Sequence, residues 1–167
     1  MKKVFELKME GDVHTPIGIY RSIRDKKKIL LESSLKHEQQ GRYSFIGASP
    51  YKELYTEGGV TVEKNADGFR KEHTGRFLDI VKRLMPIETG LTDAYPFIGG
   101  AVGYVGYDII REYEDIGDIP YDQLNMPDAH LMFFSEVIVY DHMLHQISIV
   151  SIGDEAEEPA FIAKAEK

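Results

Sequence analysis

A tight turn between two strand-like segments constrains the fold of this chain more than any other feature. Glu57-Gly58-Gly59 separates residues 51–56 from residues 60–63, and both segments are rich in the β-branched and aromatic residues that favour strands. Adjacent glycines readily adopt the positive φ angles that a short hairpin turn needs. We therefore predict an antiparallel hairpin over residues 51–63.

Predicted strands outnumber predicted helices along the chain. A second hairpin is expected where Asp141-His142-Met143 joins residues 129–140 to residues 144–152. Further strands are expected at residues 4–9, 29–33 and 42–48. Because the strands are joined by tight turns, the sheet should be mostly antiparallel.

Two helices are expected between the strands. Thr15-Pro16 combines an N-cap hydroxyl with a proline at the first helical position. Apolar residues of segment 77–84 recur at helical spacing, and Pro86 ends the pattern. The predicted fold class is α+β, a mostly antiparallel β-sheet sandwich with flanking helices.

Composition excludes several classes of protein. The 167 residues include no cysteine, which rules out disulfides, thiolate metal sites and cysteine nucleophiles. A net charge of −8 argues against binding a nucleic acid, because phosphates need clustered cations. The one basic cluster, residues 24–28, contains Asp25 and is interpreted as a solvated helix end. No apolar run is long enough to span a membrane, and no export signal is visible, so a cytoplasmic protein is expected.

Glycines recur at every third residue near the middle of the chain. Gly100, Gly103 and Gly106 follow Gly99 in the segment from Phe97 to Asp108. The spacing is neither the dinucleotide fingerprint nor the phosphate loop, and no Lys or Arg lies between residues 83 and 111. We predict that these glycines allow close backbone approach at a strand-to-helix junction.

Candidate catalytic and metal-binding residues do not assemble into a complete site. His142 and His145 form an H-x-x-H across a hairpin turn, without a third ligand, and are expected to be exposed turn residues. Asp108 and Arg111 are expected to form an ordinary ion pair on a helix. No G-x-S-x-G nucleophile elbow is present.

Two neighbouring segments carry polar groups on predicted strands. Residues 29–34 read Ile-Leu-Leu-Glu-Ser-Ser, and residues 41–49 read Gly-Arg-Tyr-Ser-Phe-Ile-Gly-Ala-Ser. A small zwitterion with an apolar side chain needs such a mixture of charged, hydroxyl and apolar groups. The alternative is a core strand pair whose hydroxyls are satisfied by backbone groups.

Three segments together resemble anthranilate synthase component I and, more broadly, the chorismate-utilising enzymes. They are Leu30-Leu-Glu-Ser33, Gly41-Arg-Tyr-Ser-Phe-Ile-Gly47 and Gly99-Gly-Ala-Val-Gly-Tyr-Val-Gly-Tyr-Asp108, the last trailed by Arg111 and Glu114. Their order and separation match the family, and the similarity covers nearly the whole chain.

The resemblance implies an activity and a regulatory site. Family members convert chorismate and ammonia to anthranilate and pyruvate in tryptophan biosynthesis, with magnesium at the active site and a glutamine amidotransferase, component II, as partner. Their Leu-Leu-Glu-Ser segment lines a pocket for the inhibitor tryptophan. The match assigns six effector-site residues: Leu31, Glu32, Ser33, Tyr43, Ser44 and Phe45.

The resemblance also implies that the chain is a piece of a larger two-part fold. Residues 1–152 correspond to the amino-terminal, effector-binding region, and residues 153–167 to the start of a truncated helical connection. The chorismate and magnesium ligands, and a Pro-Tyr-Met stretch of the tryptophan pocket, belong to the family's carboxy-terminal part. We therefore expect no catalytic residue, no bound magnesium and no activity in this chain alone, and we expect uncovered sheet edges and apolar surface.

Two alternatives stay open on sequence. Aminodeoxychorismate synthase component I shares the fold and these segments, although the complete Leu-Leu-Glu-Ser with Glu32 favours the tryptophan branch. The chain could also be a free-standing β-rich binding module.

Overall fold

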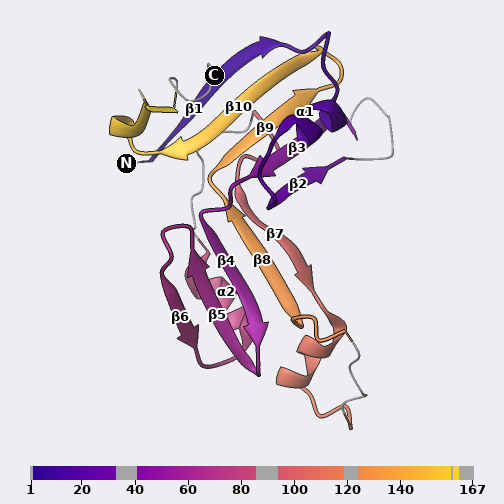
Figure 1. Cartoon of the computed structure of the whole chain (residues 1–167), viewed down its shortest axis with the longest axis vertical. Helices are drawn as coiled ribbons and strands as arrows, with labels where there is room; N and C mark the ends of the chain where they lie inside the picture. Colours follow the sequence, from indigo (N-terminus) through magenta and orange to yellow (C-terminus); the bar gives the residue numbers. More distant parts are fainter. Residues whose placement is uncertain (1, 33–40, 86–93, 119–123, 159, 162–167) are drawn as a thin grey trace. The chain divides into compact units, whose positions relative to one another are not determined.

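The computed structural model describes residues 2–32, 41–85, 94–118, 124–158 and 160–161. The chain divides into two compact units. Unit 1 comprises Met1–Pro50, Glu88–Gly100 and Phe134–Lys167, and unit 2 comprises Tyr51–Ile87 and Ala101–Phe133. The described residues form two five-stranded sheets, whose strands are labelled in Figure 1.

The first sheet has the order β1-β10-β9-β3-β2, and every neighbouring pair is antiparallel. Its strands are β1 (Lys3–Glu10), β2 (Lys28–Leu31), β3 (Tyr43–Ala48), β9 (Glu136–Asp141) and β10 (Gln146–Gly153). Val137, Val139 and Val150 are buried on one face. Helix α1 (Pro16–Ser22) connects β1 to β2.

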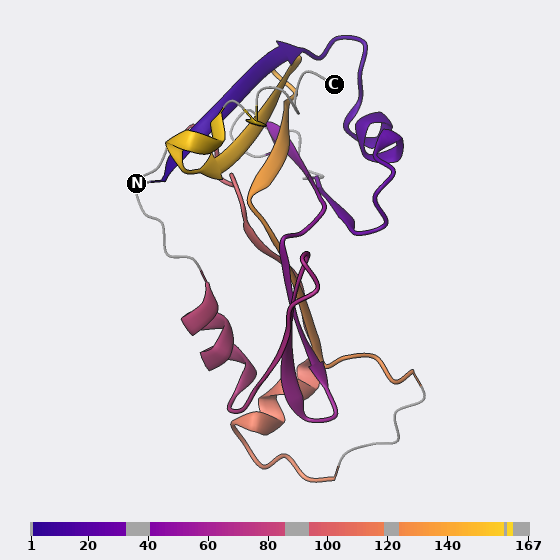
Figure 2. The same cartoon turned by 60° about the vertical axis from the view of Figure 1, so that its left-hand side comes forward.

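The second sheet has the order β6-β5-β4-β8-β7. Its strands are β4 (Lys52–Glu57), β5 (Val60–Asn65), β6 (Arg70–His73), β7 (Gly100–Val105) and β8 (Ala129–Phe134). Helix α2 (Phe77–Leu84) lies beside this sheet (Figure 2), and a 3₁₀ helix, η1 (Tyr107–Glu112), follows β7. Phe77 and Ile109 from these helices pack with three buried residues of the sheet, Leu54, Ala129 and Phe133.

The predicted fold class is confirmed, because antiparallel sheets dominate and helices are few. The first predicted hairpin is β4–β5, where Glu57 pairs with Val60. Gly58 and Gly59 have φ angles of 58° and 81°, as a two-residue turn requires. The predicted N-cap is also correct, since Thr15 Oγ1 accepts a hydrogen bond from the Gly18 N–H at 3.1 Å.

The prediction of one long strand over residues 129–140 is wrong. This segment forms β8 in one sheet and β9 in the other, with a break at Ser135. Phe133 and Phe134 are both buried, so the two-residue alternation of a single strand is lost there. Strand β6 was also missed, because within Arg70–His73 only His73 is buried and no apolar pattern marks it.

A short helical turn follows the last strand of the first sheet. A 3₁₀ turn, η2 (Glu155–Glu157), follows β10, and the Asp154 N–H donates to Glu157 Oε2 at 2.8 Å. Within the described ranges, none of the helices is long and apolar enough to cross a membrane.

Candidate effector site

The strand pair β2–β3 brings most of the predicted site residues together. Leu31 is directly opposite Phe45 in the antiparallel register, so their side chains lie on the same face of the sheet. Ser44 precedes Phe45 and therefore points to the other face, where its hydroxyl reaches Glu32. Through this contact Glu32 is linked to the face opposite to Leu31 and Phe45.

The face with Phe45 is apolar and largely covered. Tyr43 meets Tyr95 edge-on at a centroid distance of 5.5 Å, and Phe45 meets Phe97 at 5.7 Å. The Tyr95 hydroxyl donates to Glu6 Oε1 at 2.6 Å. Burial and this hydrogen bond raise the pKa of Tyr95 to about 12, so its hydroxyl stays protonated. Tyr43 and Phe45 therefore have aromatic partners within unit 1.

On the other face of β3, Ser44 takes part in a hydrogen-bonded cluster. Ser44 is 1% exposed, and its Oγ lies 2.7 Å from His142 Nε2 and 3.3 Å from Glu32 Oε1. The His142 ring also lies 5.0 Å from the Tyr140 ring. The hydroxyl of Ser44 thus binds side chains, which differs from the alternative of a core strand satisfied by backbone groups.

Sequence reasoning did not find the role of His142. Its predicted exposure in a turn is confirmed, but its contact with Ser44 was not foreseen. The two residues are 98 positions apart, and only the pairing of β3 with β9 brings them together. The Asp141-His142 pair directly after an apolar strand was the only available signal.

Strand β2 is only partly buried. Lys28, Ile29 and Leu30 are half-buried, whereas Leu31 and Glu32 are exposed. The Glu32 carboxylate therefore carries little desolvation cost in this chain, because β2 is the edge strand of its sheet. Ser33 lies outside the described residues.

An ion pair anchors the turn that carries His142. Arg42 donates from Nε and Nη2 to Asp141 Oδ2, at 2.9 and 2.6 Å. Asp141 Oδ1 accepts the N–H groups of Met143 and Leu144. Burial raises the pKa of Asp141, but the hydrogen bonds from Arg42 and from the turn outweigh it and hold the pKa below its ordinary value.

This ion pair predicts an acid-dependent loss of stability. Because the folded pKa of Asp141 is lowered, its contribution is present above the unfolded pKa of about 3.9 and is lost as pH falls through the folded pKa. Asp141→Asn should lower the free energy of unfolding by about 1–2 kcal/mol near neutral pH, since Arg42 is partly solvated. Urea unfolding of wild type and of Asp141→Asn at several pH values measures the difference between their free energies of unfolding. This difference should shrink toward acid pH.

Asp67→Asn is the matched control. Asp67 also accepts a backbone N–H, from Phe69 at 2.9 Å, in an exposed turn. The effect of Asp67→Asn on the free energy of unfolding should be small. A difference for Asp141→Asn that persists below about pH 3 would contradict the assignment to the ionised carboxylate.

The glycine-rich segment packs against a neighbouring strand, as predicted. A Cβ at Gly103 would overlap the backbone carbonyl of His130 on β8. A Cβ at Gly106 would lie 2.7 Å from the carbonyl oxygen of Asp128, which already accepts the Gly106 N–H. Strand β7 then passes into η1, so the segment is the expected strand-to-helix junction.

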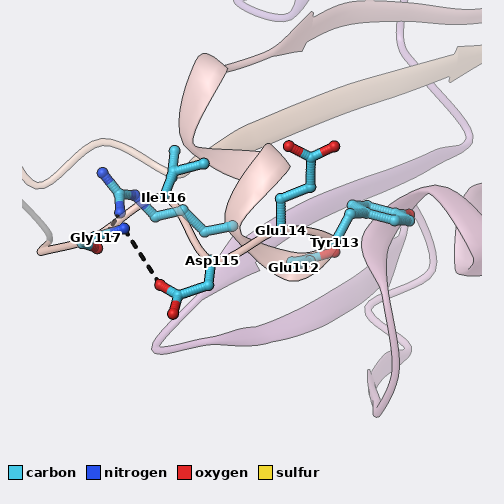
Figure 3. A pocket seen from close by; sticks show the side chains of 7 residues that line it. Glu112, Tyr113, Glu114, Asp115, Ile116 and Gly117 are labelled. Carbon is cyan, nitrogen blue, oxygen red and sulfur yellow. Dashed lines mark hydrogen bonds between the residues drawn. The ribbon is translucent and has the colours of Figure 1, made fainter.

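A surface pocket of about 430 Å³ is lined by Arg111–Gly117 after η1 (Figure 3). The predicted ion pair is present, with Arg111 Nε donating to Asp108 Oδ1 at 2.7 Å. Glu112 accepts the Phe77 N–H at the start of α2, and Asp115 accepts the Gly117 N–H. These side chains serve local structure, and nowhere in the described part of the chain do three His, Asp or Glu residues converge as a metal site requires.

Several known proteins that are similar to this chain carry the same name. Anthranilate synthase component 1 of Acetivibrio thermocellus is 35% identical over 147 residues, which cover 86% of this chain and 30% of that protein. The Pseudomonas putida protein of the same name is 35% identical over 163 residues, which cover 90% of this chain and 32% of that protein. The crystal structure of anthranilate synthase component I from Streptococcus pneumoniae TIGR4 superposes with a TM-score of 0.62 at 30% identity, over 94% of this chain and 35% of that one. No family model matches the chain.

Fold and relatives together define part of a biosynthetic enzyme. The chain spans about a third of the length of the relatives that it matches, as expected for an amino-terminal portion. Over most of its length the chain is homologous to one part of anthranilate synthase component I. The predicted resemblance is thereby confirmed.

Proposed function

We propose that this chain is the amino-terminal, effector-binding part of an anthranilate synthase component I. The parent protein would act as a lyase that converts chorismate and ammonia to anthranilate and pyruvate in tryptophan biosynthesis. The observation that carries the proposal is the match of 86% of this chain to only 30% of a relative with that name.

The chemistry at the end of β2 supports an amino acid as effector. Glu32 is exposed and ionisable, so its carboxylate is available to an ammonium group. Leu31 is 38% exposed on the opposite face of the same edge strand. A ligand at the end of an edge strand can reach side chains on both faces of the sheet. One amino acid could therefore bind Glu32 through its ammonium group and Leu31 through its apolar side chain, although these two residues lie on opposite faces.

Tryptophan is the effector that we propose, with Leu31, Glu32, Ser33 and Ser44 as its contacts from this chain. Tyr43 and Phe45 would support the site through their contacts with Tyr95 and Phe97. The remaining part of the pocket would come from the rest of the parent. The isolated chain should therefore bind tryptophan weakly or not at all.

We propose magnesium and component II as the cofactor and the partner of the parent protein, and not of this chain alone. In the described part of the chain no three His, Asp or Glu side chains lie together, and we propose that the magnesium ligands belong to the rest of the parent protein. The name component 1 of the relatives implies a component II. We propose a glutamine amidotransferase that supplies ammonia in that role.

Enzyme activity, measured for this chain and for a longer protein that contains it, tests the proposal. The 167-residue chain and the longest open reading frame that contains it are each mixed with chorismate, magnesium and ammonia, and anthranilate fluorescence is followed. We expect turnover only from the longer protein and inhibition of that turnover by tryptophan. Aminodeoxychorismate as the product would favour the related synthase instead. A reading frame that ends at Lys167 would favour a free-standing binding module.

A further inference from the structure

The Ser44 hydroxyl lies between a carboxylate and an imidazole. Its Oγ is 3.3 Å from Glu32 Oε1 and 2.7 Å from His142 Nε2. Ser44 itself is 1% exposed, whereas Glu32 and His142 at its two sides are exposed. The buried hydroxyl therefore links two solvent-accessible ionisable groups, one in the turn after β9 and one just after β2.

A hydroxyl has one proton to donate, and this limits the hydrogen bonds in the cluster. When His142 Nε2 is unprotonated, Ser44 can donate to the imidazole, and both Glu32 oxygens remain open to a ligand. When Nε2 carries a proton, it donates to Ser44 Oγ, and the Ser44 proton goes to Glu32. Protonation of His142 thus occupies one lone pair of the Glu32 carboxylate.

The charge of the imidazolium acts in the same direction. A positive charge two hydrogen bonds away from Glu32 repels an ammonium that binds this carboxylate. We propose that His142 is a positioning residue of the effector site, and that its protonation weakens binding of an amino-acid ammonium at Glu32. This inference rests on the proposed function of the site.

Four other ionisable residues lie around His142. On β9, Asp141 stays ionised because hydrogen bonds outweigh burial and lower its pKa, and Tyr140 donates to the Gly11 carbonyl. At the start of β3, the Arg42 carbonyl accepts the His142 N–H, and the Arg42 guanidinium stays charged, since the hydrogen bond to Asp141 raises its pKa. From β2, Glu32 faces the cluster. Histidine is the side-chain type whose ordinary charge change falls between about pH 5 and 8.

Calorimetric titration of L-tryptophan tests the inference in the longest protein that the gene encodes. The dissociation constant is measured at about pH 6 and about pH 8, which bracket an ordinary histidine. We expect binding roughly three- to tenfold weaker at the lower pH in wild type, from the repulsion between the two cations. His142→Gln keeps a polar side chain without the charge, and its two dissociation constants should agree.

His145→Asn is the matched control from the same turn. His145 has a positive φ of 49°, which asparagine tolerates, and its backbone carbonyl accepts the Gly11 N–H. This variant should keep the full pH dependence of wild type. Thermal melting of both variants checks that the hairpin is intact.

The possible outcomes separate this inference from the proposed function. Equal wild-type dissociation constants at the two pH values, with tryptophan bound, would overturn the role of His142 alone. A His142→Gln variant that binds more weakly but keeps the wild-type pH dependence would show a merely structural role and would also overturn it. Absence of tryptophan binding at both pH values would overturn the proposed effector site and this inference with it.

Discussion

Gly103→Val should lower the free energy of unfolding by about 3 kcal/mol or more. The added Cβ would overlap the backbone carbonyl of His130, and a backbone atom cannot swing aside as a flexible side chain can. Strand β7 would have to separate from β8, at the place where Ala129 and Phe133 contribute to the core of unit 2. Urea or thermal unfolding of wild type and variant measures the loss.

Gly59→Asn is the control, because it replaces a glycine at a position where the new side chain meets no neighbouring atom. A Cβ at Gly59 meets no atom within 4 Å, and asparagine tolerates its φ of 81°. The control should stay within about 1 kcal/mol of wild type. Phosphate or nucleotides should not protect wild type against melting, and a clear rise with either would restore the hypothesis of a phosphate-binding loop.

Glu32→Gln should raise the inhibition constant of tryptophan by about one to two decades in the longest protein that the gene encodes. The neutral amide loses the charge-assisted hydrogen bond to the ligand ammonium, worth roughly 1.5–3 kcal/mol. Glu32 is exposed in this chain, so its replacement leaves no buried group unpaired. Inhibition curves of wild type and variant, measured side by side, test the expectation. Ser33→Ala should act in the same direction.

Glu10→Gln provides a control with the same chemical change. Glu10 is exposed at the end of β1, which is the opposite edge of the sheet from β2. Its inhibition constant should equal that of wild type. An unchanged constant in Glu32→Gln would place the effector elsewhere, and an equal loss of turnover and of inhibition would show that Glu32 is structural.

The sequence alone determined the local elements and the family. Glycine pairs, an N-cap before a proline and helical apolar spacing act within a few residues, so their effects appear directly in the hairpin at Gly58-Gly59, the cap at Thr15 and helix α2. The glycine spacing and the absence of nearby cations also indicated packing in place of phosphate binding, and the carbonyl under Gly103 agrees. The three short motifs identified the family, which the relatives confirm.

Only the tertiary structure decided how the site residues are combined. Whether Glu32 and Ser44 share a face with Leu31 and Phe45 depends on the register of β2 against β3, because a shift of one residue reverses every side chain. The contact of His142 with Ser44 depends on the pairing of β3 with β9 across nearly one hundred residues. The same long-range pairing divides residues 129–140 between two sheets. No local pattern encodes these choices, since they follow from which strands can bury their apolar faces together.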